Sequence, residues 1–495
     1  MKFADDPPPP QAQRRQPLAE LGFRFCFVYF SLYIFFTQML TILFILPVGE
    51  LPEFGALFPM RHLVFWVARH VFKVEHTLVV TNSGSGDKIY DWVQVACILS
   101  LATVATAAWS ALGRGQSPSV RLVKWFRLVV RFAVSATMIS YGMVKAIPLQ
   151  MPAPQLTRLL EPFGNFSPMG VLWYSVGASH PYEIFAGSAE LLAGVLLFLP
   201  HTATLGALVC LADAIQIFTL NMTYDVPVKL LSFHLILLSL FLLAPEVPRL
   251  LNVLLLNRPA APSPQPPLLS SRRHNRIAVI CQAVFGAYLV GVNLYSAIQG
   301  WYSHGGGAPK SPLYGIWNVT AMSIDGQLRS PLIIDYDRWR RVVFQTPTTM
   351  SFQRMDDTFV PYTAAIDVNA GSLSLTKATD KSWRAAWTFR RPTPEQLILD
   401  GDLDTYYIID ANFNAFPAAT NTLTKLQIDG YEALHKGAGH ADATEASQVG
   451  NIADELEHNF IPHIHDSITT ALHEDANFHE ADATFQSNIS KKLAD

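Results

Sequence analysis

Long apolar runs fill most of the first three hundred residues, and they constrain the fold more than any other feature of the sequence. A helix needs about 20 mostly apolar residues to cross a hydrocarbon layer of about 30 Å. We therefore predict a multi-pass membrane protein with a bundle of about seven transmembrane helices. An eighth run, 57–74, is interrupted by Arg61, Arg69 and His70, so we interpret it as an amphipathic helix at the membrane interface. The seven runs that have the required length, or come close to it, are 21–47, 90–112, 122–147, 182–199, 202–222, 226–244 and 277–298.

The composition supports a membrane protein and argues against nucleic-acid binding. Half of the residues are hydrophobic and 15% are charged, whereas an average soluble domain has about 25% charged residues. The net charge is −3, and no basic tract with interleaved aromatic residues occurs, so we expect no nucleic-acid partner. The expected partners are the lipid bilayer and, beyond it, membrane or extracytoplasmic proteins.

Lysine and arginine residues in the short loops predict the orientation of the bundle, because cytoplasmic loops carry an excess of them. Three arginines flank the first run, and basic residues also gather between the second and third runs and between the sixth and seventh. The loop 150–181 holds only Arg158, although the loop between the first two runs is an exception and is also basic. This pattern predicts a cytoplasmic N-terminus and, after seven crossings, an extracytoplasmic C-terminal domain.

Shifts in composition divide the chain into segments. After residue 301 the apolar runs give way to glycine, aspartate, threonine and aromatic residues. The predicted order is a disordered leader (1–20), the transmembrane bundle (21–257), a Pro-rich linker (258–276), a last transmembrane helix (277–298), a β-rich soluble domain (311–415) and a partly helical tail (426–495).

The domain 311–415 shows the pattern of a small antiparallel β-barrel or sandwich. Short alternating or β-branched runs recur about every ten residues between turn signals. Its opening residues, Gly315-Ile-Trp317, resemble the G-x-W motif of lipocalin-type barrels, in which a basic side chain covers the tryptophan. The predicted strands are 339–345, 360–367, 372–377, 383–389 and 396–400.

Ionisable residues within the apolar runs are candidates for function, because a charge inside a bilayer is costly. Counting from the outer end of each run at about 1.5 Å per residue places four of them at a similar depth, about 9–12 Å below the outer surface. These are Tyr141, Glu190, Asp213 and His234. A second layer nearer the outside contains Lys145, Tyr182, Glu183, Asp225 and Lys229, with His180 beside them.

Two interpretations of these residues stay open. They could form a polar pocket that exchanges protons with a bound quinone-like or isoprenoid head group, or they could neutralise one another and hold the bundle together. The four cysteines lie apart without a C-x-x-C pair, and the runs contain no metal-ligand spacing. Seven histidines of the tail include His463 and His465, a pair that could bind a metal ion. We favour a solvated acidic helix with incidental histidines and therefore expect no metal site.

The stretch 140–258 resembles the DoxX-like membrane proteins of bacteria, a group that includes the quinone-linked DoxD subunit and MauE-type proteins. Its most specific parts are Tyr182-Glu-Ile-Phe-Ala-Gly187, Ala189-Glu-Leu-Leu-Ala-Gly194 and Tyr224-Asp-Val-Pro-Val-Lys-Leu230. The resemblance implies a four-helix core at about 122–257 and a bacterial inner-membrane location.

Three functions follow as expectations. The first is an accessory or scaffold component of a membrane-associated redox or envelope complex. The second is a subunit of a quinone-linked oxidoreductase, which would need a bound quinone or a partner because the chain has no dithiol. The third is a binder of a lipid or small molecule that uses the bundle pocket and the outer barrel together. Whether the protein is an enzyme stays open.

Overall fold

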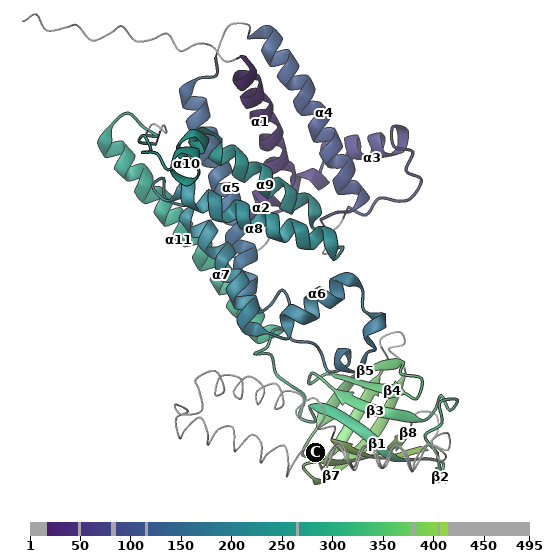
Figure 1. Ribbon diagram of the computed structural model, residues 1–495. Helices are drawn as coiled ribbons and strands as arrows, with labels where there is room; N and C mark the ends of the chain where they lie inside the picture. The colour runs from purple at the N-terminus through teal and green to yellow at the C-terminus, as the bar shows by residue number, and fades with distance from the viewer. Residues whose placement is uncertain are drawn as a thin grey trace, which may run out of the picture. The chain divides into compact units, whose positions relative to one another are not determined.

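The computed structural model describes residues 17–47, 51–80, 86–113, 117–263, 267–377, 383–402 and 406–413. The chain divides into two compact units, and each is described by itself (Figure 1). The helical unit comprises Met1–Ala153 and Phe166–Ala308, and the second unit comprises Pro154–Asn165 and Pro309–Asp495. The tail 426–495, with its histidines, and most of the leader 1–20 lie outside the described residues.

The helical unit contains the predicted bundle. Its helices are α1 Pro17–Phe36, α2 Gln38–Leu43, α3 Met60–His70, α4 Ile89–Leu112, α5 Val120–Ala146, α6 Pro168–Gly177, α7 His180–Leu196, α8 Ala203–Thr223, α9 Lys229–Leu243, α10 Val247–Leu254 and α11 Arg272–Ser303, with short 3₁₀ turns η1 Phe54–Ala56 and η4 Ala244–Glu246. Two further turns, η2 Arg158–Leu160 and η3 Phe163–Asn165, belong to the second unit.

All seven predicted runs fall on helices, and five helical segments are long and apolar enough to cross a membrane. The other two runs fall on α5, which carries several charges, and on α7, which has 17 residues. The predicted apolar helices are therefore present, and five of them are long enough to cross a membrane, whereas the count of seven crossings stays a prediction. The five segments are Leu18–Phe36, Ile89–Leu112, Ala203–Thr223, Lys229–Leu254 and Arg272–Ser303.

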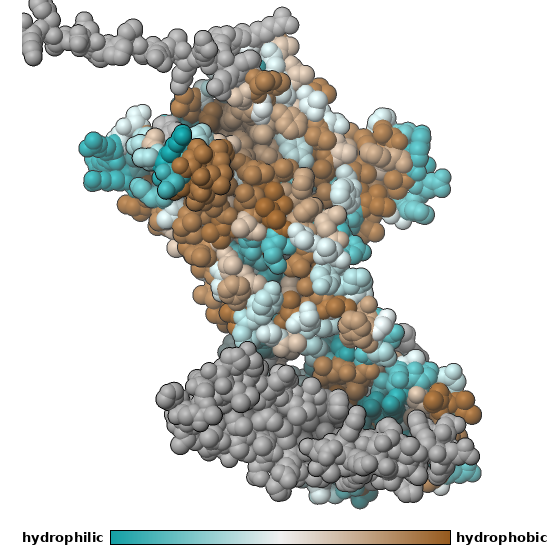
Figure 2. All heavy atoms as spheres, viewed as in Figure 1, coloured by the Kyte–Doolittle hydropathy of each residue, from teal (hydrophilic) through white to brown (hydrophobic). Residues whose placement is uncertain are grey.

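The outer faces of the helical unit are apolar. Figure 2 shows brown, hydrophobic side chains over much of its visible surface. Large apolar residues such as Val104, Phe185 and Val284 are more than half exposed on their helices. Apolar exposure of this extent suits lipid, because soluble proteins rarely expose large contiguous apolar patches. The helical unit therefore has the surface of a membrane protein.

Helix α5 lies at the centre of this unit. Every residue from Val130 to Ile139 is buried, so α5 is surrounded by protein on all sides. Its arginines face helix ends: Arg127 donates to the carbonyl oxygen of Leu242 at 2.6 Å, near the C-terminus of α9. Cations are stabilised there by the helix dipole and the free carbonyls. Protein neighbours explain why α5 tolerates charges that a lipid-facing helix would not.

Two helices differ in detail from the sequence prediction. The first apolar run breaks at Thr37, whose hydroxyl donates to the carbonyl oxygen of Tyr33 at 2.7 Å, and α2 continues as a separate helix. Helix α3 buries Met60, Val64 and Ala68 on one face and exposes its arginines, as expected of an amphipathic helix.

The second unit is a closed antiparallel β-barrel. Its strands are β1 Gly315–Ile324, β2 Gln327–Leu328, β3 Trp339–Phe344, β4 Thr349–Arg354, β5 Phe359–Asp367, β6 Ser372–Thr376, β7 Arg384–Thr393, β8 Gln396–Asp402 and β9 Tyr406–Phe413. The strands pair in chain order, and β1 pairs with β3 on one side and with β9 on the other. The short β2 extends β1 as a hairpin. The five predicted strands are confirmed as β3, β5, β6, β7 and β8. The G-x-W motif marked the start of β1, and the sequence analysis missed β2, β4 and the closing strand β9.

The G-x-W tryptophan is buried in the barrel core. Trp317 is 1% exposed, and its indole N–H donates to the carbonyl oxygen of Leu313 at 3.0 Å. The guanidinium carbon of Arg391 lies 5.4 Å from the centroid of a Trp317 ring. A basic side chain covers this tryptophan, as the motif predicts.

Large aromatic side chains fill the described interior of the barrel. The Trp339 ring stacks on Phe352 at 4.1 Å between centroids and lies 5.6 Å from Trp387. Phe344 and Leu375 are fully buried beside them. A barrel that carries a ligand needs a cavity in its interior. This packing therefore favours a structural core and argues against ligand binding inside the barrel.

Candidate functional site: a polar cavity among the apolar helices

Glycines bring α5 and α7 together so closely that their backbones touch. A Cβ on Gly142 of α5 would lie 2.6 Å from the backbone nitrogen of Leu191 and 2.8 Å from the carbonyl oxygen of Gly187 on α7. Small residues permit this approach and strengthen packing between membrane helices. The contact places Lys145, near the end of α5, directly beside Glu190 in the middle of α7.

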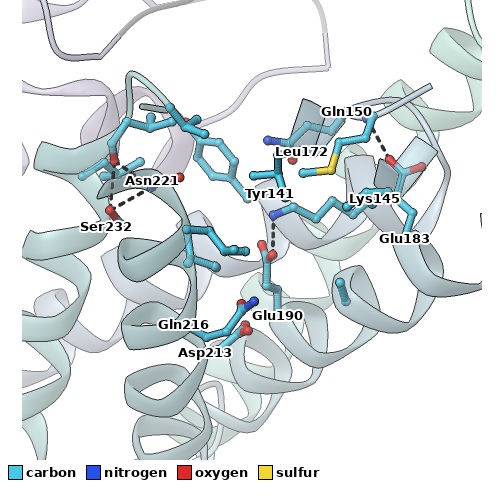
Figure 3. Close-up of a pocket in the computed structure, with 18 of the residues that line it drawn as sticks. Tyr141, Lys145, Gln150, Leu172, Glu183, Glu190, Asp213, Gln216, Asn221 and Ser232 are labelled. Carbon is cyan, nitrogen blue, oxygen red and sulfur yellow. Dashed lines mark hydrogen bonds and ion pairs between the residues drawn. The ribbon is translucent and has the colours of Figure 1, made fainter. Parts of the chain in front are cut away.

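Lys145 and Glu190 form a buried ion pair. The ammonium group donates to a carboxylate oxygen of Glu190, and the two residues are 7% and 2% exposed. Figure 3 shows the lysine side chain reaching along α5 toward the carboxylate. Because both charges are removed from water, each depends on the other for its solvation. The pair therefore fixes one wall of the site.

The pair borders a cavity of about 150 Å³ between α5, α6, α7, α8 and α9. Six of the nine residues predicted for the pocket line it: Tyr141, Lys145, Tyr182, Glu183, Glu190 and Asp213. Most of the remaining wall is apolar and includes Met138, Leu172, Ile217 and Leu235. The cavity thus combines an acidic patch with an apolar wall, as sites for amphipathic small molecules do.

Three acceptor atoms at the cavity are buried without a hydrogen-bond partner in the described part of the chain: Oε2 of Glu183, Oδ2 of Asp213 and Oε1 of Gln150. The other carboxylate oxygen of Glu183, a fully buried residue, accepts from the backbone N–H of Met151 at 2.9 Å. Buried polar atoms almost always have partners. These three acceptors therefore call for a donor that the described residues do not supply.

His234 does not belong to the cavity, contrary to the sequence prediction. Its Nδ1 lies 2.6 Å from the carbonyl oxygen of Leu230, and its Nε2 lies 2.8 Å from the hydroxyl of Tyr29 on α1. Since a carbonyl only accepts, Nδ1 carries the proton and Nε2 accepts from Tyr29. The ring also stacks on Tyr33 at 3.6 Å. Leu231 and Leu235 face the cavity instead, because a depth count cannot tell which side of α9 a residue occupies.

Asp225 and Lys229 also lie outside the cavity lining. They pair with each other at 2.7 Å where α9 begins, and the Asp225 side chain is 82% exposed. Asp87, which the sequence analysis did not single out, accepts from the backbone N–H groups of Lys229 and Leu230 at 2.7 and 2.9 Å. These residues shape the start of α9, where free N–H groups need acceptors.

Uncharged polar residues of the cavity escaped the sequence analysis, which considered ionisable groups. Gln216 lies one turn after Asp213 on the same face of α8 and lines the cavity beside it (Figure 3). Asn221 donates to the hydroxyl of Ser232 at 3.0 Å and connects α8 to α9. The spacing of three residues from Asp213 is the signal that could have identified Gln216.

A second cavity of about 290 Å³ adjoins the first. Its lining includes Glu53, Lys88, Asp91 and Gln94, and it shares Tyr141 with the first cavity. The Tyr141 hydroxyl donates to Oε1 of Gln38 at 3.3 Å. Tyr141 therefore stands between the two cavities, with its ring on one side and its hydroxyl bonded toward the other.

The site carries few groups suited to metal or thiol chemistry. Within the described ranges, no cluster of three or more His, Cys, Asp or Glu side chains has the geometry to hold a metal ion. All four cysteines are free, and Cys210 is buried beside Ser239 at 3.2 Å. The chemistry of the site therefore rests on carboxylates, an ammonium group and amides.

Comparison with known proteins gives one partial likeness. No family model matches the chain, and no solved structure matches it. The chain is 41% identical over 73 residues to a Bacillus subtilis (strain 168) protein described as uncharacterized protein YwoB. The match covers 15% of this chain and 47% of that protein, so the chain spans about half the length of the curated relative. That description names no activity.

Proposed function

We propose that the helical unit binds a small amphipathic molecule whose head group donates hydrogen bonds in the cavity beside Lys145 and Glu190. The observation that carries this proposal is the set of unpartnered acceptors on Glu183, Asp213 and Gln150. A donor-bearing head group would satisfy them, and the apolar wall would take the rest of the ligand. The packed interior of the barrel supports a site in the helices alone.

Hydroquinones are the ligand class that best joins this chemistry to the DoxX-like motifs. A quinone offers only carbonyl acceptors to the three unpartnered acceptor atoms, whereas its reduced form offers two hydroxyl donors. The lining contains three carboxylate residues and one lysine, so the wall is acidic and favours ligand groups that donate hydrogen bonds. In this proposal the chain is an accessory component of a membrane-associated redox or envelope complex in a bacterial inner membrane, with the barrel on the extracytoplasmic side.

The test compares three ligands that differ in their donors: a short-chain hydroquinone, the matching quinone and the hydroquinone dimethyl ether. Binding to the detergent-purified protein is measured by calorimetry, and co-purifying lipids are identified by mass spectrometry. We expect the hydroquinone to bind at least about tenfold more tightly than the ether, because one hydrogen bond to a charged group contributes about 1.5–3 kcal/mol.

Substitutions locate the site. Glu183→Gln and Asp213→Asn each replace a carboxylate that lines the cavity, and we expect both to weaken hydroquinone binding. Asp225→Asn is the matched control, since Asp225 is exposed outside the cavity lining. Equal affinity for hydroquinone and ether, or equal losses in all three variants, would contradict the proposal.

A further inference from the structure

The second cavity of the helical unit has a polar wall, unlike the first. Its lining combines the charged side chains of Glu53, Lys88 and Asp91 with the amides of Gln38 and Gln94. A volume of about 290 Å³ has room for several water molecules, since liquid water occupies about 30 Å³ per molecule. Roomy cavities with polar walls hold water, whereas apolar cavities stay dry or take apolar ligands. The chemistry of this wall therefore favours water over a lipid chain.

Contacts between helix ends place the second cavity at one end of the helical unit. Gln94, near the start of α4, donates to the carbonyl oxygen of Phe36, the last residue of α1, at 2.8 Å. The backbone N–H of Gly86, just before α4, donates to the carbonyl oxygen of Pro227, just before α9, at 2.9 Å. Because α1, α4 and α9 are candidate spans, the cavity lies at a membrane face, which is the extracytoplasmic one in the predicted orientation.

The wall of this cavity runs from the surface into the interior. Glu53 is exposed, Lys88 and Asp91 are half-buried, and Gln94 is 5% exposed. The Lys88 ammonium group lies 3.4 Å from the Asp91 carboxylate, so the excess charge of the lining is the negative charge of Glu53. An acidic entrance attracts cations and repels anions.

We propose that the second cavity is an aqueous vestibule, through which water and small cations pass from the membrane surface to Tyr141 at the border of the first cavity. The Tyr141 hydroxyl donates to Gln38 at the inner end of the vestibule, and the same residue lines the first cavity. The Tyr141 ring centroid lies 6.0 Å from the Lys145 ammonium group, so water at Tyr141 is close to the buried ion pair. The vestibule brings water to this point whatever ligand the first cavity binds.

Single cysteines test whether water reaches the wall. In a chain whose four native cysteines are replaced by alanine, Gln94→Cys on α4 and Leu230→Cys on α9 each place a thiol on the lining. The matched controls are Ile98→Cys and Leu238→Cys, which lie one and two turns further along the same helices and are fully buried away from the lining. Gln94 and Leu230 are themselves only 5% and 7% exposed, so surface exposure alone would not separate the two sets.

Two methanethiosulfonate reagents of similar size, one with a quaternary ammonium group and one with a sulfonate, are added at pH 8 to each protein in phosphatidylcholine nanodiscs. Mass spectrometry follows the rate of thiol modification. A thiol reacts as the thiolate, which does not form readily in apolar surroundings. We expect both lining positions to react and both controls to stay unmodified. The ammonium reagent should react at least about fivefold faster than the sulfonate, because one excess charge attracts the first and repels the second.

Glu53→Gln tests the origin of this preference. Added to the Gln94→Cys chain, it removes the excess charge and should bring the two rates together. Glu75→Gln is the matched control, since Glu75 is exposed outside the lining, and it should leave the preference unchanged.

Glu53→Cys, at the exposed end of the wall, is the positive control for reagent access. Modification at position 53 without any at 94 and 230 would overturn the proposal, because the cavity would then be closed to water. Equal rates at the lining positions and at 98 and 238 would also overturn it, because loose packing of the helices would explain the reaction. A sulfonate that reacts as fast as the ammonium reagent would overturn the passage of cations.

Discussion

Some of the buried charged groups at the cavity are paired, and others keep an oxygen without a hydrogen-bond partner. Lys145 and Glu190 neutralise each other, as the structural interpretation of the polar layer predicts. Glu183 and Asp213 each keep an oxygen without a partner in the described residues. A pair of charges can be purely structural, whereas an unpartnered carboxylate costs stability and persists mainly where function needs it. The Lys145–Glu190 pair is therefore assigned to the stability of the fold, and Glu183 and Asp213 to contact with a ligand.

The Lys145–Glu190 pair predicts a double-mutant result. Lys145→Met leaves the Glu190 carboxylate buried without its cation, and Glu190→Leu leaves the ammonium group alone. We expect each single change to cost about 3–5 kcal/mol, because an uncompensated buried charge remains. The double variant should be closer to the parent than either single variant. Thermal unfolding in detergent measures all four proteins, and additive losses in the double variant would contradict the expected coupling.

Helix contacts determine where these charges meet. The α5–α7 interface is built on Gly142 and Gly187, and each leaves no room for a Cβ without moving the opposing backbone. The tyrosine–histidine stack of Tyr29, Tyr33 and His234 joins α1 to α9 on another side. A wider α5–α7 spacing would separate Lys145 from Glu190. The close contact between these two helices therefore sets the geometry of the site.

The glycine contact predicts opposite outcomes for two identical substitutions. Gly187→Ala should destabilise the protein by about 1–3 kcal/mol, because the added methyl group forces the two backbones apart. Gly291→Ala on α11 is the matched control, because nothing lies within 4 Å of the position of its Cβ. Alanine is a better helix former than glycine by about 1 kcal/mol, so Gly291→Ala should be neutral or stabilising. Melting temperatures in detergent distinguish the two outcomes, and equal shifts would contradict the close backbone contact.

The whole molecule consists of two units whose stability rests on different interactions. The helical unit buries its polar backbone inside helices and presents apolar side chains outward, whereas the barrel depends on ladders between strands. The closing pairs of β9 with β1 and β8 join strands β1 and β3–β9 into a closed cylinder. Opening that closure would expose two strands with unpaired backbone groups.

A proline in β9 should therefore disrupt the second unit alone. Ile409 pairs with Met322 of β1 and Leu399 of β8, so Ile409→Pro inserts a residue that cannot donate to the ladder. We expect limited proteolysis to cleave the barrel of this variant while the helical unit stays intact. Val368→Ser in the exposed turn after β5 serves as the control and should be cleaved like the parent. Parallel loss of both units would show that the barrel supports the helices.

The sequence alone determined the positions of the long apolar helices and of five strands. Runs of apolar residues predicted the positions of the helices, because lipid-facing and core-facing helices both need apolar side chains. Alternating runs and turn signals predicted five strands, and nine of their ten ends lie within two residues of the observed ones. The G-x-W motif located the buried Trp317. Counting along each helix also grouped Tyr141, Glu190 and Asp213, which line one cavity in the structure.

Only the tertiary structure decided which side chains of different helices and strands face one another. Depth along a helix follows from the sequence, but the side on which His234 projects depends on where α1 and α5 pack around α9. Closure of the barrel by β9 and the assignment of 154–165 to the second unit rest on contacts between distant residues, such as the Leu156 N–H donating to Gln345 at 2.8 Å. Such contacts leave no periodic signal in the sequence of either segment, because the position of each segment depends on the geometry of the other.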